Sequence, residues 1–224
     1  MNCLWCEAEL VPEVTWSTFI GPFEANVLCQ ICSERMERIG AIVCPRCNRP
    51  MEEMKPCYDC ERWELSGTKL TMNKSLFLYN EFMQEVVAQW KYRGDYALIE
   101  LFRADVEQIF RSMRTNWYDA ILVPIPLSEL RMKERGFNQA AVLAQATGLP
   151  VQDLLTRVHG EKQSKKTRHE RMNTGNPFSI RGSVPPKVVL VDDIYTTGQT
   201  LQHAATLLHQ NGSVEIASFT LIRG

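Results

Sequence analysis

The chain has 224 residues, of which 45% are hydrophobic and 23% are charged, and its formal net charge at pH 7 is −1. This composition is typical of a globular protein and leaves room for one α/β domain and a small extra module. The near-zero net charge excludes nucleic-acid binding driven by the field of the whole protein. Positive charge is nevertheless displaced along the chain, because residues 1–60 hold nine acids and five bases while residues 61–224 hold 17 acids and 20 bases.

Two kinds of segment are missing from the sequence. No stretch approaches the roughly 18 consecutive apolar residues of a membrane span. Residues 1–7 have neither the basic nor the apolar region of a signal peptide. We therefore expect a cytoplasmic protein without membrane insertion, in which cysteines serve a purpose other than disulfide formation.

The cysteines are grouped in a way that predicts metal binding. All eight lie in the first 60 residues and form four Cys-x-x-Cys pairs: Cys3/Cys6, Cys29/Cys32, Cys44/Cys47 and Cys57/Cys60. Two pairs supply the four thiolates of a tetrahedral site, so the sequence predicts one or two Cys₄ zinc sites, with an iron–sulfur centre as the alternative. In nearest-neighbour pairing, the first two pairs bind one metal ion and the last two pairs bind another. An interleaved cross-brace, in which the pairs combine in another order, is the alternative.

We assign residues 1–65 to this zinc-binding module and expect metal to supply much of its folding free energy. Its role is either structural, including protein contacts, or nucleic-acid binding, and its acidic balance favours the former.

Residues 66–224 show alternating strand and helix patterns. We expect a strand at 75–79, amphipathic helices at 81–92 and 97–113, and a buried strand at 121–126. A basic loop at 131–139 then leads into a helix of small residues that ends near Thr147. Because a loop after a parallel strand lies at the carboxyl end of the sheet, this basic loop is a candidate ligand-binding segment.

The remaining elements complete an α/β pattern. A strand is expected at 178–180, a central strand from Val188, a helix over 201–211, and an alternating strand at 214–222. Strands that alternate with helices predict a mostly parallel sheet flanked by helices. The sequence shows no internal repeat.

The segment 188–200 carries the strongest chemical signal. Four apolar residues are followed by Asp192 and Asp193, and then by a turn rich in hydroxyl groups that opens a helix. Such a strand–turn–helix presents backbone N–H groups and a positive helix end to a phosphate. Gly198 allows close approach of the backbone, and the acidic pair fits the hydroxyl groups of a ribose, directly or through Mg²⁺.

This pattern resembles the motif with which type I phosphoribosyltransferases bind 5-phosphoribosyl 1-pyrophosphate (PRPP). The resemblance implies that Asp192 and Asp193 hold the ribose 2′- and 3′-hydroxyls. It also implies that the 5′-phosphate is wrapped by Thr196, Thr197, Gly198, Gln199 and Thr200.

The whole chain resembles the ComF family of ComFC-like competence proteins, which join a Cys₄-type zinc module to a type I phosphoribosyltransferase-like domain. The matching segments are the Cys-x-x-Cys pairs, Lys91-x-Arg93-Gly94-Asp95, Val123-Pro124-Ile125-Pro126, Arg135-Gly136-Phe137-Asn138-Gln139, Arg168-x-x-Arg171-x-Asn173 and 188–200. Family membership implies a part in the uptake of single-stranded DNA during natural transformation, beside a ComFA-type helicase.

The resemblance also assigns the basic segments. Arg131, Arg135 and Asn138 would lie on the pyrophosphate side of PRPP. The stretch 157–173 would be the flexible catalytic loop, in which the candidates for closing over PRPP are Lys165, Lys166, Arg168 and Arg171. Such cations stabilise the negative charge that grows on departing pyrophosphate, and Mg²⁺ would bridge PRPP oxygens.

Three functions are consistent with the sequence. The first is a PRPP-binding accessory protein of DNA uptake, the second an active phosphoribosyltransferase of nucleotide salvage, and the third a non-catalytic zinc-containing scaffold. The sequence contains no recognisable site for a nucleobase acceptor, so it supports PRPP binding better than transfer.

Overall fold

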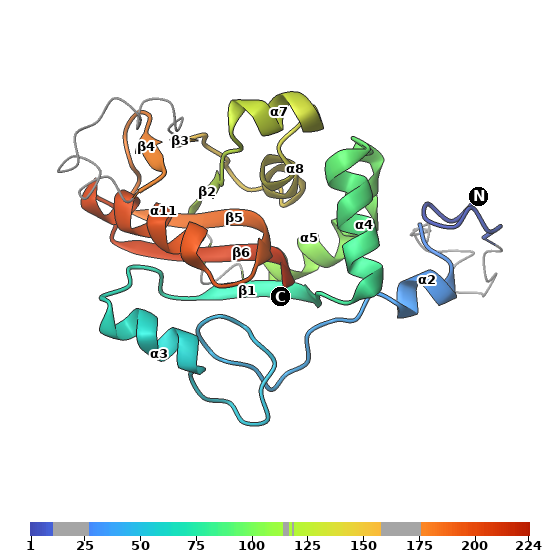
Figure 1. The fold of residues 1–224 in the computed structure, drawn as a ribbon, viewed down its shortest axis with the longest axis horizontal. Helices are drawn as coiled ribbons and strands as arrows, with labels where there is room; N and C mark the ends of the chain where they lie inside the picture. The colour runs from blue at the N-terminus through green and yellow to red at the C-terminus, as the bar shows by residue number, and fades with distance from the viewer. Residues whose placement is uncertain (11–26, 114–116, 118, 158–175) are drawn as a thin grey trace.

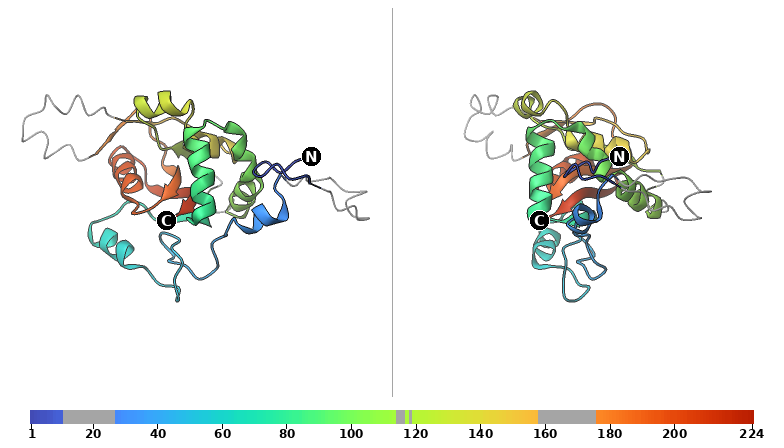
Figure 2. Two further views of the ribbon diagram at one scale, coloured as in Figure 1. Left: turned by 45° about the vertical axis from the view of Figure 1, so that its right-hand side comes forward. Right: turned by 90° about the vertical axis from the view of Figure 1, so that its right-hand side faces the viewer.

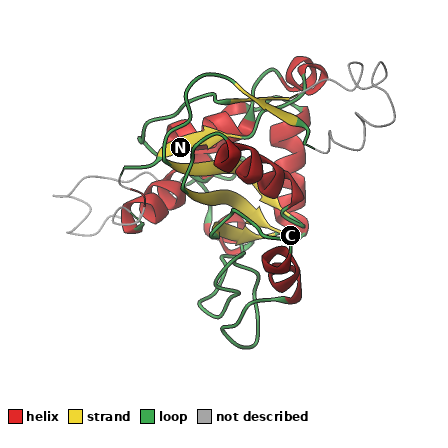
Figure 3. Cartoon of the chain, turned by 90° about the vertical axis from the view of Figure 1, so that its left-hand side faces the viewer, coloured by secondary structure: helices red, strands yellow, loops and turns green. Residues whose placement is uncertain are grey.

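A four-stranded parallel sheet organises the molecule. The computed structural model describes residues 1–10, 27–113, 117, 119–157 and 176–224. The sheet has the order β1 (Asn73–Leu78), β6 (Glu215–Arg223), β5 (Lys187–Tyr195) and β2 (Ile121–Pro124), and every neighbouring pair in it is parallel. The predicted fold class is confirmed: helices flank this sheet on both sides (Figures 1 and 3).

Each face of the sheet covers its own hydrophobic core, because successive side chains of a strand point to opposite faces. On β5, Val189 and Val191 join the core under α4 (Glu81–Tyr92), α5 (Arg103–Ser112) and α8 (Gln139–Ala146). Val188 and Leu190 join the other core, under α11 (Gln199–Gln210). The apolar run 188–191 of β5 is therefore buried on both faces of the sheet, as the sequence predicts.

The helix predicted at 81–92 has the bounds of α4, whose Asn80 side chain accepts a hydrogen bond from the backbone N–H of Met83. The single helix predicted over 97–113 is wrong. The chain instead forms a 3₁₀ helix, η1 (Tyr96–Leu101), and then α5, with Phe102 between them at φ −111°. The fully buried Phe102 ring packs 5.8 Å from Trp90 and 6.0 Å from Phe77, so tertiary packing overrides the helical pattern here.

Shorter elements surround the carboxyl end of β2. The segment predicted as a basic loop is mostly helical, since it contains α7 (Glu129–Arg135), which Ser128 caps. Gly136, at φ +78°, ends α7, and α8 follows at once. A small antiparallel hairpin pair, β3 (Leu155–Arg157) with β4 (Phe178–Ile180), lies beside α11.

Two strands differ from their predicted form. The acidic pair does not follow β5 but lies within it, because pairing with β6 continues as far as Tyr195. The final strand, predicted as alternating, is buried from Ile216 to Arg223 on both faces. Its polar residues Ser218 and Thr220 are covered rather than exposed, because the segment around Asn48 packs against that face.

The cysteine-rich segment forms two units of the same construction, a repeat that the sequence does not reveal. In each unit the residue before the first cysteine bridges the residue three places after the second, as Asn2 does with Glu9 and Val43 with Pro50. Glu7 and Asn48 occupy equivalent left-handed positions, at φ 61° and 62°. The third cysteine of each unit then begins a helix, α2 (Gln30–Glu34) or α3 (Tyr58–Leu65).

The two units contact different parts of the domain. The first lies beside α4, where the Trp5 and Phe82 rings meet edge to face at 5.3 Å, and the second lies under β1 and β6 (Figures 1 and 2). Between them, residues 37–39 hydrogen-bond to Leu76 and Leu78 and so cover the outer edge of β1. Within the described part of the chain, no helix has both the length and the apolar character needed to cross a bilayer.

Candidate functional site

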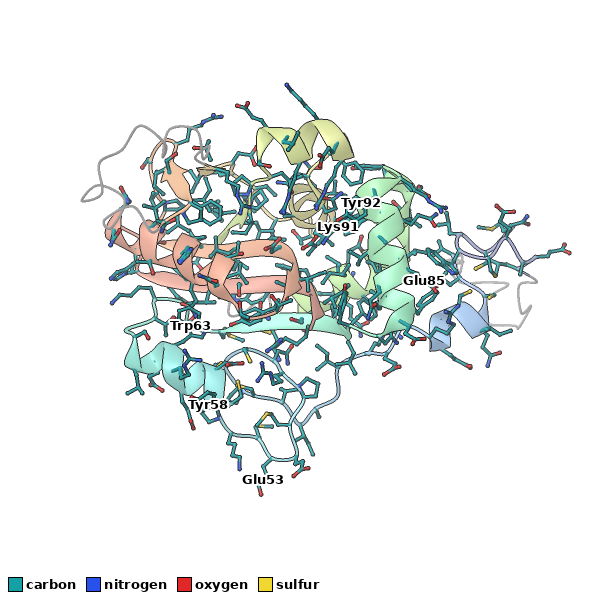
Figure 4. The ribbon with its side chains drawn as sticks, viewed as in Figure 1. Glu53, Tyr58, Trp63, Glu85, Lys91 and Tyr92 are labelled. Carbon is teal, nitrogen blue, oxygen red and sulfur yellow. The ribbon has the colours of Figure 1, made fainter. Side chains whose placement is uncertain are left out.

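The acidic pair lies at the carboxyl end of the central strand, and among the described residues it forms an ion pair with a lysine. Asp193 forms an ion pair with Lys91, which is in the last turn of α4 and is 14% exposed at its side chain, as is Asp193. The Asp192 carboxylate accepts a hydrogen bond of 2.9 Å from the backbone N–H of Asp193. Through Lys91, the C-terminal end of α4 thus contacts the acidic pair. Figure 4 shows this end of the helix.

The two carboxylates differ in their electrostatic environment. Burial, and repulsion from Asp193, raise the pKa of Asp192 to about 8, while Lys91 acts in the opposite direction. A carboxyl group with a pKa in this range changes its charge near neutral pH. The site is therefore sensitive to any ligand that brings a positive charge or a hydrogen-bond donor to the pair.

The turn after β5 leads directly into α11, as the sequence predicts for this strand–turn–helix. Gly198, at φ +79°, precedes the first turn of α11, and the side chains of Thr196, Thr197 and Gln199 are exposed. A Cβ atom on Gly198 would lie 2.5 Å from Cζ of Tyr195, so both the backbone angle and the space require glycine. Thr200 follows within the first helical turn, and the acidic pair and the predicted loop are thus adjacent.

The residues predicted on the pyrophosphate side have different surroundings. Arg131 is exposed on α7. Arg135 is 9% exposed, donates a hydrogen bond of 3.0 Å to Gln139, and lies over the Tyr92 ring at 5.7 Å. The Nε of Arg135 is buried without a partner among the described residues. A buried guanidinium N–H without an acceptor costs free energy, which an anion would recover.

Asn138 has a structural position. Its side chain accepts a hydrogen bond from the N–H of Ala140 at the start of α8 and donates one to the carbonyl of Ile125, just after β2. It therefore fixes α8 against the carboxyl end of β2. The candidate loop residues Lys165, Lys166, Arg168 and Arg171 lie outside the described residues.

The cysteines form two separate clusters, and the nearest-neighbour pairing is confirmed. Cys3, Cys6, Cys29 and Cys32 form one, Cys44, Cys47, Cys57 and Cys60 form the other, and the sulfurs of each lie within 4.8 Å of one another. The 3.6 Å between the sulfurs of Cys6 and Cys29, and of Cys47 and Cys57, is close to the ~3.8 Å edge of a Zn–S₄ tetrahedron. It is far too long for a disulfide.

The second cluster has further features that suit a metal. All four of its cysteines are buried. Hydrogen bonds from Cys60 and from Arg223 lower the pKa of the Cys47 thiol to about 4, so this sulfur is a thiolate, the form that binds zinc. Both clusters could hold a zinc ion through four sulfur ligands.

Sequence reasoning missed three residues that border the site. Lys91 was present in a matched segment but had no assigned role. Arg223, 3% exposed at the end of β6, donates hydrogen bonds to the carbonyls of Tyr195 and Thr196. Trp63 of α3 donates one of 3.1 Å to the carbonyl of Thr197. The contacts of Lys91 and Trp63 join residues more than 100 positions apart, and those of Arg223 join residues 27 and 28 positions apart, so none of them leaves a periodic pattern in the sequence.

Comparison with known proteins shows the family of the chain. The phosphoribosyl transferase domain family matches residues 132–224. Competence protein ComFC of Bacillus subtilis is 36% identical over 99% of this chain and 94% of its own length, and Competence protein ComFC of Streptococcus pneumoniae is 33% identical over the full length of both. The chain belongs to the ComFC family.

A more distant relative of this ComFC-family chain has a different name. DNA utilization protein YhgH of Escherichia coli K12 is 26% identical over 88% of the chain and 90% of its own length. Relatives named for competence and for DNA utilization together support a role in DNA uptake. The domain match begins within α7 and covers α8, β5, α11 and β6, and so includes both the acidic pair and the loop.

Proposed function

We propose that this ComFC-family chain binds PRPP with Mg²⁺ at the carboxyl end of β5. It would act as a cytoplasmic accessory protein of natural competence, handling incoming single-stranded DNA together with a ComFA-type helicase. The observation that carries the proposal is the adjacency of Asp192 and Asp193 to the Gly198 loop at the start of α11.

Different groups of the protein would bind different parts of PRPP. The acidic pair would accept hydrogen bonds from the ribose hydroxyls, and the loop Thr196–Thr200 would donate to the 5′-phosphate. Arg135, with its unpartnered Nε, is the buried candidate on the pyrophosphate side, and Arg131 is the exposed one. Mg²⁺ would neutralise pyrophosphate oxygens, held mainly by PRPP itself and water. Zinc in the two Cys₄ clusters would be structural.

Calorimetric titration of PRPP with Mg²⁺ into zinc-loaded protein tests the proposal. The wild type should bind, and the Asp192→Asn/Asp193→Asn variant should lose binding because two amides cannot replace the carboxyl acceptors of the acidic pair. Asp153→Asn, at an exposed acid outside the site, is the matched control and should bind like the wild type. If the wild type releases no heat with PRPP, this function is excluded and the non-catalytic scaffold is the function that remains.

Transfer is a second candidate function, favoured by the intact acidic pair and by the buried cation at Arg135. Release of pyrophosphate from PRPP that depends on one compound in a panel of bases would establish a phosphoribosyltransferase. Binding of PRPP without release in the presence of any acceptor would instead support the accessory role.

The DNA role has a separate test. Lys165→Gln/Lys166→Gln should weaken binding of single-stranded oligonucleotides and reduce the slope of log K against log salt, by about 0.7 for each phosphate that the variant no longer neutralises. Lys55→Gln/Arg111→Gln, which removes two exposed charges elsewhere, should leave the slope unchanged. Equal slopes in both variants would remove the 157–173 stretch from the DNA-binding surface.

A further inference from the structure

The phosphate loop is held from behind by Arg223 of β6 and by Trp63 of α3, the helix of the second cysteine unit. Three consecutive carbonyls of the loop accept hydrogen bonds on this side. Arg223 donates to Tyr195 at 3.0 Å and to Thr196 at 3.1 Å, and the indole of Trp63 donates to Thr197 at 3.1 Å. Figure 4 shows Trp63 on α3, on the side of the molecule that carries the second unit.

These contacts fix the direction of the loop's N–H groups. In a trans peptide the C=O of one residue and the N–H of the next point in opposite directions. No peptide bond in the described chain is cis. Because the carbonyls of residues 195–197 turn toward Arg223 and Trp63, the N–H groups of Thr196, Thr197 and Gly198 turn away from the cysteine unit. Successive N–H groups with one direction form a concave site for an anion.

Arg223 joins this loop to the metal-ligating sulfur itself. Its Nε donates to the carbonyl of Cys47 at 3.1 Å, and its Nη2 lies 3.6 Å from the Cys47 sulfur. The guanidinium also stacks on the Tyr195 ring, with its Cζ 4.7 Å from the ring centroid. One planar, 3% exposed cation therefore spans the cysteine cluster and the loop.

We propose that Arg223 is a positioning residue that couples metal occupancy of the second Cys₄ cluster to ligand affinity at the phosphate loop. A bound metal fixes Cys47, Cys47 fixes Arg223, and Arg223 with Trp63 holds the loop carbonyls so that the N–H groups face the ligand. This inference rests on the proposed PRPP function. Coupling of this kind is reciprocal, so a ligand at the loop strengthens metal binding at the second cluster by the same factor.

Two measurements on the full chain test the coupling. The first is the affinity for PRPP with Mg²⁺, by calorimetry, in Arg223→Lys and Trp63→Phe variants of the zinc-loaded protein. A lysine keeps the charge but cannot reach Cys47 and the loop together, and phenylalanine keeps the ring but not the N–H. Each variant should bind PRPP about tenfold or more weakly, as for other losses of groups that orient a metal ligand.

The second measurement is zinc affinity, by equilibrium competition with a chelating dye, with and without PRPP. PRPP should strengthen binding of one of the two zinc ions in the wild type and of neither in Arg223→Lys. Arg46→Gln is the matched control, because Arg46 is in the same unit but pairs with the exposed Glu64 at 2.6 Å. It should behave like the wild type in both measurements.

The outcomes separate the two proposals. The coupling is wrong and the function stands if Arg223→Lys and Trp63→Phe bind PRPP as tightly as the wild type does. In that case PRPP should also leave the zinc affinity of the wild type unchanged. If the wild type itself does not bind PRPP, the proposed function fails, and the coupling fails with it. Trp63→Phe, at a partly exposed side chain, keeps the test valid if Arg223→Lys does not fold.

Discussion

Asp192 and Asp193 place two carboxyl groups side by side, and among the described residues Lys91 forms an ion pair with Asp193. Repulsion within the acidic pair lowers the stability of the fold, and the ion pair offsets part of that loss. Removing Lys91 should therefore destabilise the fold, whereas neutralising Asp192 should stabilise it.

The first of these effects is a prediction for Lys91→Gln. Loss of the cation leaves Asp193 without its close partner in a poorly solvated place, so the free energy of unfolding at pH 7 should fall by about 2 kcal/mol. Chemical denaturation measures it. Lys74→Gln, on β1 and without a described charge partner, is the control. An unchanged midpoint for Lys91→Gln would mean that the ion pair contributes nothing to stability.

Asp192→Asn should have a pH-dependent effect. The pKa of Asp192 is raised in the folded protein, to about 8, above its value of about 4 in an unfolded chain. The folded state therefore binds more protons, and stability is lost as pH rises from about 4 to about 8. The asparagine variant escapes this loss, so its Tm should match the wild type near pH 4 and exceed it by about 3 °C or more at pH 8. A constant Tm difference across that range would contradict the assignment.

Gly198→Ala tests the loop. The substitution adds a Cβ at φ +79° and forces it against the buried Tyr195 ring, so stability should fall by about 3 kcal/mol, from backbone strain and overpacking together. Gly67→Ala has the same backbone strain, at φ +72°, but open space around it, and should lose only about 1 kcal/mol. Equal losses in denaturation would show that the Tyr195 contact relaxes without cost.

At the scale of elements, the second cysteine unit covers a polar patch of the sheet. Ser75 of β1 and Thr220 of β6 share a hydrogen bond of 2.7 Å, and Asn73 bonds to Ser75 and Ser218 at 2.8 Å each. Asn48 of the cysteine turn accepts a hydrogen bond of 2.8 Å from the backbone N–H of Ser75. The buried backbone N–H of Ser75 therefore keeps its acceptor only while the unit stays in place.

The repeat of the two cysteine turns supplies a matched test of that packing. Asn48→Ala should destabilise the protein by about 2 kcal/mol, because the buried N–H of Ser75 loses its acceptor. Glu7→Ala changes the equivalent left-handed position of the first turn, where the side chain is exposed, and should cost much less. Thermal unfolding of both variants, loaded with zinc, measures the difference. Equal effects would mean that the cost is backbone strain alone.

Local signals explain which elements the sequence predicts correctly. The helix at 81–92 has a capping asparagine and one apolar stripe; in the structure the asparagine caps the helix and the stripe is buried. The helix at 97–113 has the stripe too, but the aromatic packing of Phe102 divides it. The repeat of the two cysteine units could not be predicted, because the units share backbone geometry and the spacing within each Cys-x-x-Cys pair but little other sequence. The alternation expected in β6 failed because the cysteine unit buries its polar face.

At the scale of the whole molecule, the two cysteine units stabilise separate regions, one beside α4 and one beneath the phosphate loop. The motif 188–200 could be predicted from sequence because its residues are contiguous. Its supports could not, since Lys91, Trp63 and Arg223 come from three distant segments. Cysteine spacing predicted one or two Cys₄ sites, but it could not predict which pairs would join or where either cluster would pack.

Zinc removal should therefore act on the entire fold. Excess zinc at about 100 times its Kd contributes about 2.7 kcal/mol per site, so Tm should fall by about 5–10 °C for each metal removed. Calorimetric scans before and after chelation, with zinc restored in a third scan, measure it. A Tm unchanged by chelation would show that the clusters are not metal sites that stabilise the fold.

The position of β6 between β1 and β5 sets the order of events during folding. Asn73 and Ser218, which pair in the sheet, are 145 residues apart in the chain. Each cysteine unit closes over a far shorter stretch, so metal can organise these units early, whereas β1 waits for the final strand. Because long-range parallel pairing is slow, β1 spends that interval as an exposed strand edge. The neighbouring segment 37–39 can shield one side of it meanwhile, so we expect that metal bound early to the cysteine units would reduce aggregation of the nascent protein.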